Sequence, residues 1–190
     1  MVAKRIIKNY KNIIDFFTRS KVVFAEALHE QYAGILIELI TNALNYGGGE
    51  VLIDILEAED DLVEIQIFNF ESTFLDAFLK RDKKQSSLLK KFFIGKLRRF
   101  NQDFQSIVEA LFYNHTTEEY GLYSLTNDII ALKGTIEICS GVCELIIDEL
   151  LPGFYDVSEV YVNHLRRKTH QINYTPGVIT LILKKGFSNE

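Results

Sequence analysis

The hydrophobic spacing of this chain changes from a helical to an alternating period at Gly47, Gly48 and Gly49. Before these glycines, over residues 22–46, apolar residues recur three and four positions apart, which is the spacing of one face of a helix. After them, over 50–57 and 62–69, apolar residues alternate with other residues, which predicts two half-buried strands. Glycine adopts the left-handed geometry that ends a helix. The order favours a fold that combines helices with a sheet.

The same two periods predict the other elements. Residues 4–18 carry one apolar stripe at helical spacing, and 122–132 predict a further helix that ends at Gly134. Strands are expected over 135–139, 144–150 and 178–184, with a polar stretch over 157–174. The segment from 72 to 114 is predicted as a helical insert. We therefore expect a single α+β domain over residues 1–190, a two-layer sandwich with helices on one face of a mixed, mostly antiparallel sheet.

Composition limits the partners and the compartment. The 190 residues carry a formal net charge of −5, which argues against nucleic acid as the main partner because a nucleic-acid site needs a basic face. No apolar run approaches the roughly 18 residues of a membrane span. Two cysteines, Cys139 and Cys143, are too few for a secreted disulfide scaffold. We expect a cytoplasmic protein in which both cysteines are reduced packing residues.

The segment ELITNALNY, residues 38–46, carries the most informative polar residues. Glu38 and Asn42 are four apart, so they share one face of the predicted helix, and Asn45 lies on the same side. A carboxylate and a carboxamide so placed can hold a hydrated Mg²⁺ ion, which takes few protein ligands and completes its shell with water and phosphate oxygens. The alternative is that these residues form an ordinary solvated helix face.

ELITNALNY resembles the N box of the GHKL ATPase superfamily, which includes gyrase and the histidine kinases, above all the kinase form Glu-Leu-x-x-Asn-Ala-x-Lys-Tyr. The order that follows is also similar: two strands, a variable lid, a glycine-bearing turn, a helix and a return to the sheet. EYGLYSLTNDIIALKGTIEICSG resembles the second glycine box with its helix. The resemblance covers roughly residues 32–150. It implies a histidine-kinase-like ATPase fold of the Bergerat type, with ATP and Mg²⁺ as ligands.

The resemblance assigns roles to individual residues. Asn42 would be the magnesium ligand that bridges the nucleotide phosphates, and Glu38 would orient or deprotonate the attacking group. Tyr46 would flank the nucleotide. Asn45 occupies the place of the usual lysine, which removes a positive charge from the phosphate site.

Both glycine boxes depart from the pattern of the family. Asn69 stands where the family places an Asp that accepts from the adenine amino group, and Phe70 and Glu71 fill glycine positions. Bulky residues there hinder the close backbone approach that glycine allows. In the second box only Gly121, followed by Leu122, remains of Gly-x-Gly-Leu, so fewer unhindered backbone N–H groups face an anion. We expect weak nucleotide binding.

Two functions stay open. One is a small stand-alone signalling protein that binds ATP and acts on a partner protein as a kinase or ATPase. The other is a degenerate relative that serves as an interaction, phosphotransfer or anti-sigma-like module without ATP turnover.

The basic residues between 80 and 99 fit a phosphate-facing lid, a surface for an acidic partner or a solvated helix face. The apolar stripe of the predicted helix over 4–18 could be a homodimer contact, and His29, in the helix that runs into the N box, is expected to be structural.

Overall fold

The computed structural model describes residues 3–8, 11–12, 15, 26–46, 50–57, 62–69, 97–112, 121–153, 156–157, 161–162, 165–169 and 177–184. The described elements, in chain order, are β1 (Ala3–Ile7), α2 (Glu26–Tyr46), β2 (Val51–Glu57), β3 (Leu62–Asn69), α5 (Gln102–Phe112), α6 (Leu122–Ala131), β4 (Thr135–Ser140), β5 (Cys143–Ile147), β6 (Arg166–Thr169) and β7 (Gly177–Lys184). The helix that ends at Tyr46 and the two strands that follow it form as the sequence predicts.

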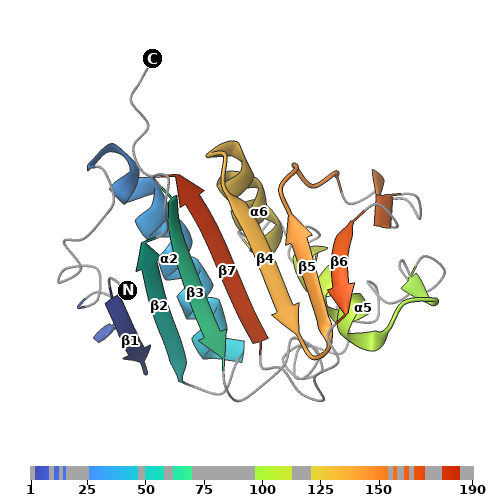
Figure 1. Ribbon diagram of the computed structural model, residues 1–190, viewed down its shortest axis with the longest axis horizontal. Helices are drawn as coiled ribbons and strands as arrows, with labels where there is room; N and C mark the ends of the chain where they lie inside the picture. The colour runs from blue at the N-terminus through green and yellow to red at the C-terminus, as the bar shows by residue number, and fades with distance from the viewer. Residues whose placement is uncertain are drawn as a thin grey trace.

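The strands form one seven-stranded sheet in the order β1-β2-β3-β7-β4-β5-β6. Every described pairing is antiparallel. The predominance of antiparallel pairs is confirmed, whereas the parallel pairs that a mixed sheet would contain do not occur among the described strands. The last strand of the chain, β7, lies at the centre between β3 and β4 (Figure 1). Because β7 is flanked on both sides, its alternate residues Ile179, Leu181 and Leu183 are buried in the core.

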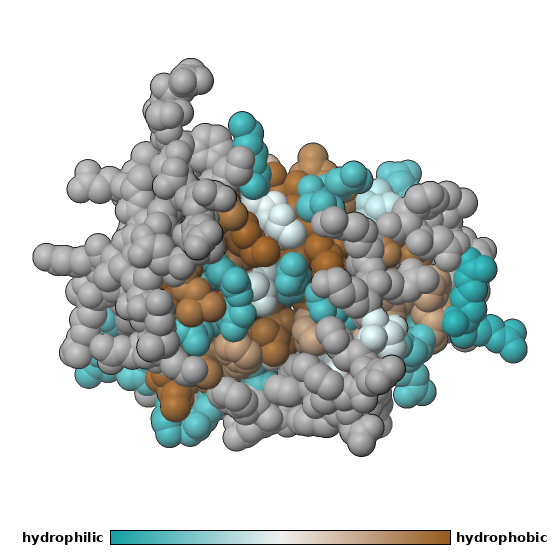
Figure 2. Space-filling view, in the orientation of Figure 1, coloured by the Kyte–Doolittle hydropathy of each residue, from teal (hydrophilic) through white to brown (hydrophobic). Residues whose placement is uncertain are grey.

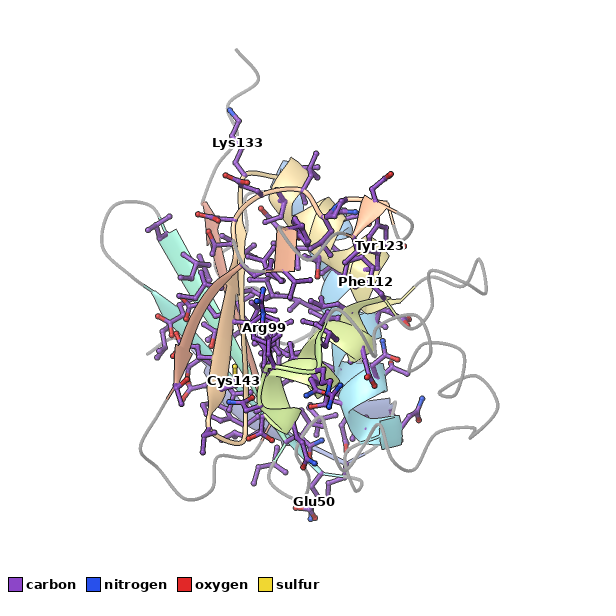
Figure 3. All side chains as sticks on the ribbon, turned by 90° about the vertical axis from the view of Figure 1, so that its right-hand side faces the viewer. Glu50, Arg99, Phe112, Tyr123, Lys133 and Cys143 are labelled. Carbon is purple, nitrogen blue, oxygen red and sulfur yellow. The ribbon has the colours of Figure 1, made fainter. Side chains whose placement is uncertain are left out.

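The three described helices all lie on one face of the sheet. Figure 1 shows α2, α5 and α6 behind the strands, and the view turned by 90° in Figure 3 separates a strand layer from a helical layer. Helix α2 contacts β2 and β3, α5 contacts β4 and β5, and α6 lies against β4 and touches both other helices. The core lies between the two layers and contains the inward residues of each strand. The predicted α+β, two-layer arrangement is confirmed at this level.

The predicted helix over residues 4–18 is wrong at its beginning. Ala3–Ile7 form strand β1, which pairs with β2. The adjacent Ile6 and Ile7 fit either a helical or a strand period, and pairing with β2 selects the strand. Ile7 is 1% exposed and faces the core, whereas Ile6 is 56% exposed on the other face of the sheet. Lys11, Asn12 and Asp15 are helical, and the rest of the range lies outside the described residues. The apolar stripe from which a dimer contact was inferred is therefore not a single helical face.

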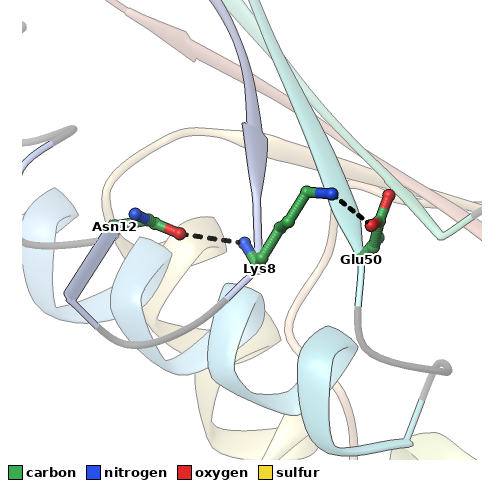
Figure 4. A network of polar contacts seen from close by, with 3 residues as sticks. All are labelled: Lys8, Asn12 and Glu50. Carbon is green, nitrogen blue, oxygen red and sulfur yellow. Dashed lines mark hydrogen bonds and ion pairs between the residues drawn. The ribbon is translucent and has the colours of Figure 1, made fainter.

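Polar contacts hold the end of β1 beside the beginning of β2. The ammonium group of Lys8 forms an ion pair with Glu50, and the backbone N–H of Lys8 donates to the side-chain oxygen of Asn12 (Figure 4). Both charged groups are exposed, so the pair contributes at most about 1 kcal/mol to stability. The contacts fix the position of the chain where it leaves the sheet.

Two further elements differ from the sequence-based expectation. Strand β6 falls in the stretch predicted to be polar and irregular, and its four residues include Arg166, Arg167 and Lys168. Of the predicted helical insert over 72–114, the structure describes 97–112, where α5 is confirmed as a helix. Most of α5 is buried, including Phe104, Ile107, Val108 and Leu111, so this part of the insert is a core helix.

Candidate functional site

The polar face of α2 carries the pair predicted from the N box. The side-chain amide of Asn42 donates a hydrogen bond to Oε1 of Glu38, with 3.1 Å between the atoms. Both side chains are half-buried, and Asn45 is exposed one turn further. Among the described residues, the side chains of Glu38 and Asn42 form no other hydrogen bond or ion pair. The two side chains therefore hold each other in position, and this local arrangement follows from their i, i+4 spacing.

The second part of the candidate site is the N-terminus of α6. Gly121 is the N-cap of this helix and is buried, and no side chain in the described structure caps it. Leu122, the first helical residue, is half-buried against the core. The first N–H groups of a helix have no partner within the helix, and they carry a partial positive charge. An uncapped N-terminus of this kind can accept an oxyanion.

The third part is the end of β3. Asn69 is the last residue of this strand, half-buried, and lies opposite Val51 and Gly177 in the sheet. It is the neutral residue in the position where the resemblance implies an Asp. Phe70, Glu71 and Gly47 to Gly49 lie outside the described residues, as does the side chain of Tyr46, whose backbone ends α2.

The fold brings these three parts toward one end of the molecule. In Figure 1, α2 and β3 both end at the lower edge, whereas α6 ends at the upper edge where β4 begins, so the N-terminus of α6 points downward. Helices α2 and α6 are in contact. The C-terminal ends of α2 and β3 and the N-terminus of α6 therefore lie toward the same end of the molecule (Figure 1).

Two buried hydroxyl groups in this region were not identified from the sequence. Thr126, one turn into α6, is fully buried, and neither its hydroxyl nor the buried hydroxyl of Thr41 on α2 has a hydrogen-bond partner in the described structure. A buried hydroxyl without a partner costs about 1–3 kcal/mol. Threonine within a helical period looks like an ordinary packing residue, so the sequence carries no signal for either one.

A metal ion at this region would need ligands beyond the protein. Within the described ranges, no group of three or more His, Cys, Asp and Glu side chains could hold a metal. The orientation of the Asn42 amide places its nitrogen toward Glu38 and its oxygen away from it. An amide oxygen is a suitable Mg²⁺ ligand, and phosphate and water oxygens usually supply the rest of the shell. The side-chain oxygen of Asn42 is therefore suited to be one protein ligand of an ion whose other ligands come from phosphate and water.

Other polar side chains near α5 and α6 hold elements together. Asp103 of α5 accepts the backbone N–H of Val142 at 3.0 Å, which fixes the hairpin turn between β4 and β5. Asn127 of α6 accepts the backbone N–H of Leu151 at 2.8 Å, and the hydroxyl of Tyr123 donates to the carbonyl of Pro152 at 3.1 Å. These contacts join separate elements through backbone groups, which is a structural use of polar residues.

The two cysteines lie on opposite faces of the sheet. Cys143 faces the core and is 1% exposed, whereas Cys139 is half-buried on the outer face, away from the helices. They are on neighbouring strands, but Cys139 is opposite Glu144, and Cys143 is opposite Ser140. Side chains on opposite faces of a sheet point apart, so no disulfide joins the two cysteines.

Comparisons with protein-family models, with curated proteins and with solved structures find no match to this chain. None of the described helices is both long enough and apolar enough to cross a membrane.

Proposed function

We propose that the chain is a small GHKL-type signalling protein of the cytoplasm, with a Bergerat-type ATPase fold, that binds a magnesium-bound adenine nucleotide weakly and acts on a partner protein as a kinase or ATPase. The observation that carries this proposal is the Asn42–Glu38 hydrogen bond on α2, beside a helix whose N-terminus at Gly121 has no side-chain cap. A carboxamide oxygen suits the Mg²⁺ ion that accompanies a nucleotide phosphate chain, and an uncapped helix N-terminus suits the phosphate oxygens.

Each residue has a distinct task in this proposal. Bound Mg²⁺ would neutralise phosphate charge, with Asn42 as its protein contact. Glu38, held in place by the amide of Asn42, would orient or deprotonate the attacking group, because a general base must first be positioned. The N–H groups that follow Gly121 would bind phosphate oxygens. Asn69, at the end of β3, would accept a hydrogen bond from the adenine amino group, while Tyr46 and Asn45 at the end of α2 would flank the nucleotide.

A specific observation favours a second candidate, a pseudo-ATPase that keeps the fold as a protein-interaction, phosphotransfer or anti-sigma-like module. The positions of a family lysine and a family aspartate are occupied by Asn45, which is exposed, and Asn69, which is neutral. Loss of charged groups from a phosphate site reduces transition-state stabilisation more than it reduces binding. In this second candidate the nucleotide is bound without turnover, or is not used.

Thermal-shift and calorimetric titrations with ATP and MgCl₂ test the proposal. A ligand at ten times its Kd stabilises the folded state by about 1.4 kcal/mol, so millimolar ATP should raise the melting temperature measurably. Asn42→Ala should abolish the magnesium-dependent part of the shift. Gln102→Ala is the matched control, since it removes an exposed amide from α5, and it should leave the shift unchanged.

The outcomes separate the two candidates. No shift at millimolar ATP would contradict nucleotide binding, and a shift that persists in Asn42→Ala would remove this residue from the site. Nucleotide binding with phosphate release that is lost in Glu38→Gln would support the ATPase or kinase. Binding without any turnover in the unmodified protein, together with nucleotide-independent capture of a defined partner, would support the interaction module.

A further inference from the structure

The edge strand β1 has a doubled residue pattern. After its first residue it reads Lys-Arg-Ile-Ile, so each basic or apolar residue has a neighbour of the same kind. In the observed register Lys4 lies opposite Asp54, and Ile6 lies opposite Leu52, on the outer face of the sheet. Ile7 is buried in the core, whereas Ile6 is exposed. A slip by one residue turns every side chain of a strand to the other face. The spacing within β1 does not by itself decide between the two faces.

One alternative register matches β2 almost as well. A shift by one residue would place Arg5 opposite Asp54, and Ile6 would enter the core in place of Ile7. Because the two core residues are identical, burial of apolar surface does not separate the registers. The outer face mixes apolar and polar surface (Figure 2), so it accepts an isoleucine from either position. Asp54 is only 8% exposed, and a buried carboxylate needs a nearby cation. Of all slips by one or two residues, only this one keeps a basic residue opposite Asp54.

Lys8 distinguishes the two registers. Its ammonium group pairs with Glu50, and the two residues continue the observed register one step beyond β1 and β2. The backbone N–H of Lys8 also donates to the side-chain oxygen of Asn12 (Figure 4). In the shifted register Lys8 would instead lie opposite Val51, which is fully buried on the core face. The ion pair would be lost and a charge would face apolar side chains, which is unfavourable.

We propose that Lys8 is a register lock: its ion pair with Glu50 holds β1 in the observed register, and its release lets β1 shift by one residue. Ile6 and Ile7 then exchange places between the outer face and the core. The two paired side chains are 61% and 46% exposed, so salt weakens the lock. Among the described strands β1 pairs with β2 alone, so the shift disturbs no second strand. It changes the side chains that this edge of the sheet presents to a partner.

Nuclear Overhauser effects between methyl groups report the register directly. In protein labelled at the Ile and Leu methyls, the observed register predicts a signal between Ile6 and Leu52, and the shifted register predicts one between Ile7 and Leu52. Lys8→Val removes the charge and supplies a side chain that suits the position opposite Val51. The ratio of shifted to observed register should rise by at least about tenfold, because burial of a valine favours the shifted register.

Further variants separate the charge from the shape of the side chain. Lys8→Arg keeps the charge and should retain the signal between Ile6 and Leu52 alone. Glu50→Gln removes only the ion pair and should raise the ratio by about 1.5-fold to fivefold, the range expected for an exposed pair. Salt at about 1 M should act on the unmodified protein in the same direction. Glu64→Gln is the matched control, because Glu64 on β3 lies opposite Leu56 and Ile182 rather than a cation, and it should leave the ratio unchanged.

Three results would overturn the proposal. Lys8→Val could keep only the signal between Ile6 and Leu52. It could lose both signals while the amides of β1 exchange rapidly with solvent, which would show that Lys8 attaches the strand rather than selects its register. Lys8→Arg could shift as far as Lys8→Val. If Lys8→Val fails to fold, an unchanged ratio both in Glu50→Gln and at high salt overturns the proposal instead. None of these results depends on whether the protein binds ATP, so the two proposals fail separately.

Discussion

The two halves of the helical layer use their polar side chains differently. Around α5 and α6, Asp103 and Asn127 accept backbone N–H groups from other segments, and Tyr123 donates to a backbone carbonyl. On α2, the polar pair Glu38 and Asn42 bond to each other and, among the described residues, to nothing beyond their own helix. A side chain that satisfies a distant backbone group holds the fold together, whereas a pair that satisfies only itself remains available to a ligand. This difference distinguishes α2 from the α5–α6 half, and it is the reason why the proposed function is placed on α2.

The largest expected loss of stability comes from a core substitution in the α5–α6 half. Phe112 at the end of α5 is fully buried, and its ring centre lies 5.5 Å from that of Tyr123 on α6 (Figure 3). Phe112→Ala should lower the free energy of unfolding by about 3–5 kcal/mol, since it leaves a cavity in the core. Urea denaturation measures the loss. Asn45→Ala, at an exposed position of α2, is the comparison and should change stability by no more than about 0.5 kcal/mol. Equal effects would remove the distinction between the halves.

Smaller changes in stability are expected when each of two glycines is replaced by alanine. Gly141, in the β4–β5 turn, has a φ of +59°, and a Cβ there would overlap the carboxylate of Asp103. Gly141→Ala should cost about 1–3 kcal/mol in backbone strain, besides the disturbed Asp103–Val142 bond. Gly34 on α2 has open space where a Cβ would lie, so Gly34→Ala should stabilise the protein by about 0.5–1 kcal/mol through reduced backbone entropy.

A double mutant separates the two costs at Gly141. Removal of the carboxylate in Asp103→Ala relieves the overlap but not the backbone strain, so the combined loss in Gly141→Ala with Asp103→Ala should be less than the sum of the single losses. Additive losses would show that the carboxylate and the turn are not in contact in solution.

Replacing each of two asparagines by alanine compares the two halves with the same substitution, although the expected losses of stability are smaller. Asn127→Ala should cost about 1–3 kcal/mol because it leaves the backbone N–H of Leu151 without its acceptor. Asn42→Ala removes only an i, i+4 side-chain pair and should cost about 0.2–0.5 kcal/mol. Chemical denaturation of both variants under identical conditions provides the measurement. A large loss in Asn42→Ala would indicate that the α2 pair has a structural role.

The smallest effect is a pH dependence near α6. Burial, then the nearby Glu149 and Tyr123, raises the pKa of Tyr161 to about 12. The unfolded chain releases this proton near pH 10, so the stabilisation is complete below that pH and is lost as the pH rises from about 10 to about 12. Melting temperatures from pH 8 to pH 11 should therefore fall less steeply in Tyr161→Phe. Burial also raises the pKa of Tyr32 on α2, and Tyr32→Phe serves as the comparison.

Local patterns were sufficient for most elements. The glycines after residue 46 and the change from helical to alternating spacing predicted α2, β2 and β3, because the period of each element is visible over consecutive residues. β1 was misjudged because five residues with Ile6 beside Ile7 satisfy both periods. β6 was missed because its sequence is basic, and an edge strand with few apolar residues gives no alternating signal.

The candidate site was predictable only in part. The i, i+4 spacing of Glu38 and Asn42 predicted that they share one face of a helix, and the structure adds the hydrogen bond between them. The missing side-chain cap at Gly121 and the buried hydroxyl of Thr126 depend on neighbours that are distant in sequence. The predicted functions for these residues stay predictions until nucleotide binding is measured.

The sequence by itself determined the local elements, the acidic balance and the Glu38–Asn42 pair, because these depend on residues within a few positions of each other. Only the tertiary structure decided that β7 enters the centre of the sheet, between β3 and β4. That insertion joins Phe68 to Val178 and Val178 to Cys139, residues as far apart as 110 positions (178 − 68) in the chain. Strand pairing is a non-local interaction, so the order of the sheet could not be derived from spacing along the chain.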